Sequence, residues 1–126
     1  WERPAGVASV GFHLQHLTGV LDRLFSYAKG LPLTPEQLAS LQAEKNPPDA
    51  PYSVKILIQW FRDQVEKALQ QLRETPEHTL LQTVSVGRKK LPSTILGLLF
   101  HAAEHTQRHT GQLLVAVKVV RLAVHH

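Results

Sequence analysis

Apolar residues recur at steps of three and four over three long stretches of the chain, and this spacing constrains the fold most strongly. Such steps place side chains on one face of an α-helix. The stretches are 10–28, about 52–74 and about 92–121. The chain contains no internal repeat and no run of alternating apolar and polar residues. The sequence therefore predicts an all-α protein, an antiparallel bundle of three long helices and one short one.

Capping residues mark the expected helix ends. Ser9 is placed as an N-cap of the first helix, and Gly30 as its stop. Thr34-Pro35-Glu36-Gln37 has the pattern of a capping box with proline in the first turn, which starts the short helix before Pro47-Pro48. Thr83–Val86 could be a strand, but no partner strand is apparent. We expect a loop there, with Pro92 in the first turn of the last helix.

Composition limits the class of protein. A chain of 126 residues with 43% hydrophobic residues predicts one domain over residues 1–126. No uncharged apolar stretch approaches the roughly 20 residues of a membrane span, and no secretory signal is visible. Cysteine is absent, which excludes disulfides, thiol nucleophiles and thiolate zinc sites and is compatible with the cytoplasmic location that we expect.

The net charge of +4 is scattered along the chain, and its densest run is Arg88-Lys89-Lys90. Proteins that bind nucleic acid gather positive charge on one face, so we expect no nucleic-acid partner. Histidine is the unusual residue, with eight in the chain. We interpret His125 and His126 as a remnant of a purification tag and leave them out of the argument.

Two histidines interrupt the apolar face of the last helix. At about 100° per residue, His105 and His109 fall within the arc of Leu98, Ala102, Leu113 and Ala116. Residues at i and i+4 lie on successive turns about 6 Å apart. Two adjacent buried rings cannot both become charged cheaply, and each needs hydrogen-bond partners. A shared cation satisfies both needs, since neutral imidazole is a common metal ligand. The alternative is a pair of core histidines bonded to hydroxyls or water.

The first helix offers a third ligand. His13 lies about 60° from the centre of its apolar stripe and His16 about 120°, so periodicity favours His13 as the inward residue. His16 shares an adjacent face with Val20, Arg23 and Tyr27. That face becomes interior only if a further helix packs against it, and helix geometry leaves the choice open.

His101 lies one turn before His105 and completes an H-x-x-E-H pattern with Glu104, as in inverted zinc proteases. Those enzymes need a carboxylate ligand downstream, and no Asp or Glu follows Glu104. We therefore interpret the match as accidental. Glycine-rich phosphate loops, G-x-S-x-G and the Glu-x-x-His spacing of di-iron bundles are also missing from the sequence.

Two motifs resemble a known family. Gly11-Phe12-His13-Leu14-Gln15-His16-Leu17 and Glu104-His105-Thr106-Gln107-Arg108-His109-Thr110-Gly111-Gln112 are similar to motifs of the DinB/YfiT-like superfamily of metal-binding four-helix bundles. The resemblance implies one divalent metal bound by His16, His105 and His109. Zinc and nickel both fit such imidazole ligands. Further candidates for contact with ligands or substrate are His13, His101, Arg108, Gln112 and Tyr27.

The resemblance also implies an activity and a partner. Known members include thiol-dependent S-transferases, so we expect a metal-dependent transferase or hydrolase that acts on a small molecule. Members normally begin with a long helix, which this sequence lacks, and three helices leave an apolar groove open. We expect a second copy to cover that groove in a symmetric homodimer. The alternative function is a non-catalytic helical bundle that dimerises without metal.

Overall fold

The computed structural model describes residues 1–44, 46 and 52–124. Its helices are α1 (Val10–Ala28), α2 (Pro35–Ala43), α3 (Val54–Glu74) and α4 (Ile95–Val124), with short 3-10 turns η1 (Pro4–Gly6) and η2 (Glu77–Thr79) and strands β1 (Thr83–Val86) and β2 (Leu91–Thr94). The predicted all-α bundle is confirmed. The interpretation of His125 and His126, and the stop at Pro47-Pro48, lie outside the described residues.

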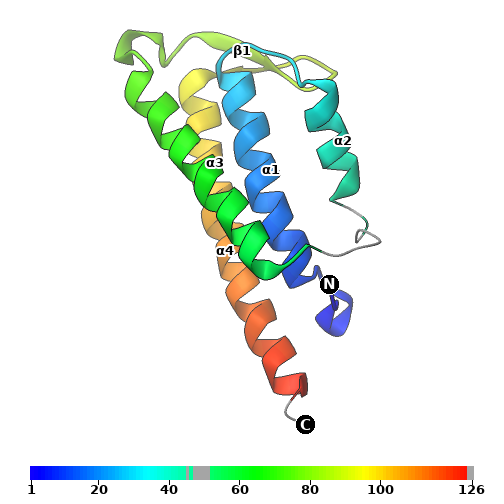
Figure 1. Cartoon of the computed structure of the whole chain (residues 1–126). Helices are drawn as coiled ribbons and strands as arrows, with labels where there is room; N and C mark the ends of the chain where they lie inside the picture. Colours follow the sequence, from blue (N-terminus) through cyan, green and yellow to red (C-terminus); the bar gives the residue numbers. More distant parts are fainter. Residues whose placement is uncertain (45, 47–51, 125–126) are drawn as a thin grey trace.

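α1 is the central helix and packs along both α3 and α4 (Figure 1). α4 runs antiparallel to α1. α3 runs parallel to α1, because α2 first carries the chain back along the bundle (Figure 1). The buried apolar side chains come from all three long helices and form the core between them: Leu14, Leu17, Leu21, Leu57, Ala68, Leu98, Ala102 and Ala116.

The predicted caps position α1 and α2. Ser9 Oγ accepts a hydrogen bond from the Phe12 N–H at 3.0 Å. Thr34 and Gln37 form the reciprocal capping box, and Gln37 Nε2 also donates to Ser26 Oγ at 2.8 Å. The cap of α2 therefore fastens this short helix to the end of α1, although α2 itself contributes no buried residue.

The prediction of a loop before the last helix was wrong. Thr83–Val86 pairs antiparallel with Leu91–Thr94, with Thr83 opposite Thr94 and Val86 opposite Leu91. Gly87, at φ +73, starts the four-residue turn that joins them. Pro92 is accommodated because a strand of a two-stranded sheet has a free edge where no N–H is needed. Helix α4 therefore begins at Ile95, where Thr94 Oγ1 accepts from the Gly97 N–H at 3.0 Å.

The second face of α1 is also interior. Val20 is 8% exposed and Arg23 is 7% exposed, because α2 lies along this side of α1 (Figure 1). The condition that would turn His16 towards the interior is thus met. Among the residues that the structure describes, no helix is long and apolar enough to cross a membrane.

Candidate metal centre

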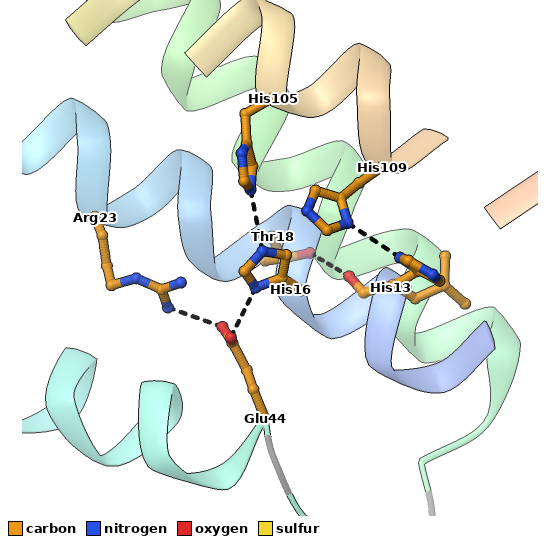
Figure 2. Close-up of polar contacts among 8 residues, drawn as sticks. His13, His16, Thr18, Arg23, Glu44, His105 and His109 are labelled. Atoms are coloured by element: carbon orange, nitrogen blue, oxygen red, sulfur yellow. Dashed lines mark hydrogen bonds and ion pairs between the residues drawn. The ribbon is translucent and has the colours of Figure 1, made fainter. Parts of the chain in front are cut away.

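Four histidines meet between α1 and α4 (Figure 2). His13 and His16 project from α1, one turn apart, and His105 and His109 from successive turns of α4. His13 is almost fully buried at 4% exposure, as the periodicity of α1 predicts, whereas the other three rings are half-buried. The histidines of the apolar face of α4 therefore do point inward, and they face histidines rather than leucines.

Three of these rings bring one nitrogen each to a common point. The Nε2 atoms of His16 and His105 lie 3.1 Å apart, and candidate ligand atoms of His16, His105 and His109 all lie within 4.8 Å of one another. With metal–nitrogen bonds of 2.0–2.1 Å, two neighbouring nitrogens on one tetrahedral or octahedral ion lie roughly 2.8–3.4 Å apart. The three side chains therefore fit a single ion.

His13 contacts His109 without sharing the common point of the three histidines. Its Nδ1 lies 3.1 Å from Nδ1 of His109, the ring nitrogen across the imidazole from Nε2. His13 is therefore placed to hold the His109 ring rather than to join the three histidines that share a point. Metal-ligating histidines usually have their second ring nitrogen engaged in this way.

The site favours neutral imidazoles. Burial lowers the pKa of His109 from 6.5 to about 4, and the neighbouring His16 and His105 add to the effect. Burial is also the largest cause of the lowered pKa of His105, followed by His16 and Arg108, while Glu104 acts in the opposite direction. Burial and the neighbouring His16 also lower the pKa of His13. Neutral imidazole is the form that ligates metal, so these rings are ready to bind at neutral pH.

Sequence analysis missed two residues of this site, Glu44 and Arg23. Glu44 lies directly after α2, with its Oε2 2.9 Å from His16 Nδ1 and its Oε1 2.8 Å from Arg23 Nη1 (Figure 2). The sequence offered one signal for them: Arg23 lies on the same face of α1 as His16. A guanidinium that is buried on this face needs an anionic partner. No local pattern marks Glu44 itself.

The hydrogen bonds around His16 and His105 have one consistent direction. Arg108 Nη2 lies 2.7 Å from His105 Nδ1, and a guanidinium can only donate. His105 therefore carries its proton on Nε2, and this N–H donates a hydrogen bond to His16 Nε2. His16 then carries its own proton on Nδ1, and this N–H donates a hydrogen bond to Glu44. In the metal-free protein a proton thus occupies the place between the two Nε2 atoms, where a metal would bind.

The remaining candidates lie around this cluster or away from it. His101 Nδ1 lies 2.7 Å from Glu104 Oε1 on the exposed side of α4, and with His105 these residues form a second, more exposed group of possible ligands. Gln112 is exposed and shares a cavity with His13. Tyr27 is 11 residues beyond His16 on α1, about 16 Å along the helix, so the structure does not bring it into the site.

A cavity of about 480 Å³ lies against His13. The segment through η1 forms one wall, and α4 forms the other. Its lining is apolar apart from His13 and Gln112: Pro4, Ala5, Val7, Ala8, Gly111, Val115, Ala116 and Val119. The volume is within the range of small-molecule pockets, which are mostly apolar with a few polar groups.

Comparison with known proteins gives one match. The family model described as the DinB superfamily matches residues 1–113, a span that contains all four histidines of the cluster, Glu44 and Arg23. No curated protein and no solved structure matches the chain.

Proposed function

Because the chain belongs to the DinB superfamily, we propose that it binds one divalent transition metal through His16, His105 and His109. The observation that carries the proposal is the convergence of three imidazole nitrogens within 4.8 Å at the α1–α4 interface. Zinc and nickel both suit imidazole ligands. Three protein ligands leave a coordination position open, which is typical of catalytic rather than structural zinc sites.

We propose that the protein is a metal-dependent transferase or hydrolase. A bound divalent ion supplies Lewis acidity and lowers the pKa of a coordinated water or thiol. The chain's own residues hold the site. Glu44 accepts a hydrogen bond from His16, and His13 supports His109. The lowered pKa values of His105 and His109 keep these two rings unprotonated. The cavity beside His13 supports a small-molecule substrate with an apolar body.

We also propose that the protein forms a homodimer. A second groove, between α3 and α4, is lined by apolar side chains that include Phe25, Val65, Leu69, Leu72 and Leu99. Leu69 is 39% exposed and Leu72 is 47% exposed. A second copy that covered this groove would remove these side chains from water, which favours association by about 25 cal/mol per Å² of apolar surface.

Metal analysis tests the proposed site. Protein ending before His125 is purified, loaded with excess zinc or nickel, desalted and analysed by mass spectrometry for bound metal. We expect one metal per chain, and a loss of metal in both His105→Ala and His109→Ala. His78→Ala is the matched control, because His78 is exposed on η2 and lies outside the cluster. A folded wild-type protein that retains no metal would support the alternative, a non-catalytic bundle.

A further inference from the structure

Glu44 is a buried carboxylate next to a helix that contributes nothing to the core. No residue of α2 is buried, yet Glu44, the residue after its last one, is only 6% exposed. Its partner Arg23 is 7% exposed. Removing two charges from water costs several kcal/mol per ion, and their mutual attraction often does no more than offset that cost. The ion pair therefore contributes little to the stability of the fold, which indicates that it has another role.

The two oxygens of Glu44 have different partners. Oε1 accepts from Arg23 Nη1 at 2.8 Å, and Oε2 accepts from His16 Nδ1 at 2.9 Å. Arg23 thus fixes the carboxylate, and the carboxylate fixes His16. Because Nδ1 and Nε2 lie on opposite sides of the imidazole, Glu44 is behind the ring and is not itself among the converging ligand atoms.

Gly19 makes room for this arrangement. A Cβ on Gly19 would overlap both Glu44 Oε1 and Arg23 Nη1. Glycine inside a helix is less favourable than alanine because it loses more conformational freedom on folding, and Gly19 lies in the middle of α1. Three features therefore meet at His16: a glycine in mid-helix, a buried ion pair, and a short helix without core residues.

We infer that Glu44 is the positioning residue for His16, held in place by Arg23 across Gly19. By accepting a hydrogen bond from the Nδ1–H of His16, Glu44 selects the tautomer whose lone pair is on Nε2 and orients the ring towards His105 and His109. A carboxylate behind a histidine also raises the basicity of the ligating nitrogen. This inference rests on the proposed metal site and assigns a role in metal binding to α2.

Cobalt binding tests the inference. Co²⁺ is titrated into wild-type, Glu44→Gln and Glu36→Gln proteins that end before His125, and binding is followed by visible absorption. We expect Glu44→Gln to bind Co²⁺ 10- to 100-fold more weakly, the range typical for loss of such a partner. Glu36→Gln removes a charge from the exposed first turn of the same helix, and its affinity should equal that of the wild type. Equal affinity of Glu44→Gln and wild type would overturn the inference while leaving the metal site intact. Failure of the wild type to bind would instead overturn the proposed function.

A second measurement needs no variant. Nitrogen-15 NMR of the histidines in metal-free wild-type protein reports which ring nitrogen carries the proton. We expect His16 to be protonated on Nδ1 at neutral pH, and to lose this preference in Gly19→Ala, where the added methyl group displaces Glu44 or Arg23. A proton on Nε2 of His16 in the wild type would contradict the assigned role even if Glu44→Gln failed to fold.

Discussion

His16 Nε2 and His105 Nε2 lie 3.1 Å apart, although the two residues are 89 positions apart in the chain. In the metal-free protein this distance is a hydrogen bond, and the same distance suits two ligands of one ion. At the proposed metal site, a proton and a metal ion would therefore compete for one place.

Metal should stabilise the folded protein, because only the folded chain brings the three histidines together. At a free zinc concentration 100 times the dissociation constant, the gain is about 2.7 kcal/mol. For a chain of this size that corresponds to a rise in Tm of roughly 10 °C. Thermal unfolding followed by circular dichroism, with zinc and then with excess chelator, measures the shift. An unchanged Tm in protein ending before His125 would contradict the prediction.

The stability of the metal-free protein should fall as the pH is lowered from about 6.5 to 4. The pKa of His109 is about 4 in the folded protein and 6.5 ordinarily, so the unfolded chain binds more protons in this window. The full shift corresponds to about 3 kcal/mol, and solvent screening of a half-buried ring reduces the expected loss to roughly 2 kcal/mol. Urea unfolding at several pH values measures it. The unfolding free energy should depend less steeply on pH in His109→Gln than in the wild type. An equal dependence in the two proteins would count against a buried neutral His109.

Removing Arg108 should strengthen metal binding. Arg108 donates to His105 Nδ1, which keeps the proton on Nε2, whereas a metal on Nε2 requires the proton on Nδ1. Metal binding therefore has to displace the guanidinium. We expect Arg108→Gln to bind zinc a few-fold more tightly in competition with a chromophoric chelator. Arg121→Gln, on the exposed end of the same helix, controls for the lost charge, and weaker binding by Arg108→Gln would show that Arg108 supports the site instead.

A charge in the groove between α3 and α4 should prevent dimerisation. Light scattering after size exclusion should give twice the chain mass for the wild type and the single chain mass for Leu72→Lys, because Leu72 lines the groove and a buried lysine without a partner is costly. Leu114→Lys places the same charge on an exposed leucine that does not line this groove and should remain dimeric. A monomeric wild type would contradict the proposed homodimer.

Local signals predicted the helices well. Ser9, Thr34 and Gln37 cap their helices through hydrogen bonds to residues within three positions, so their capping roles can be read from neighbouring residues. Thr83–Val86 was misassigned because its partner strand contains Pro92, a residue that also suits a first helical turn. A strand of four residues is defined by its pairing, and that pairing is not local.

The candidate site was only partly predictable from the sequence, because several of its contacts are also not local. The inward direction of His105 and His109 follows from the period of one helix. His16 was indicated by the family resemblance, whereas periodicity alone favoured His13, which is the more buried of the two. The inward position of His16 also depends on α2, which covers a second face of α1. Glu44 reaches His16 across 28 positions, and only the packing of α2 on α1 brings the two side chains together.

Anomalous diffraction from zinc-loaded crystals at the zinc absorption edge would locate the metal itself. We expect one strong peak between α1 and α4, about 2.0–2.1 Å from a ring nitrogen of each of His16, His105 and His109, with Glu44 on the far nitrogen of His16. A peak at His101, Glu104 and His105 on the exposed side of α4, or no peak within the cluster at saturating zinc, would contradict the proposed metal site.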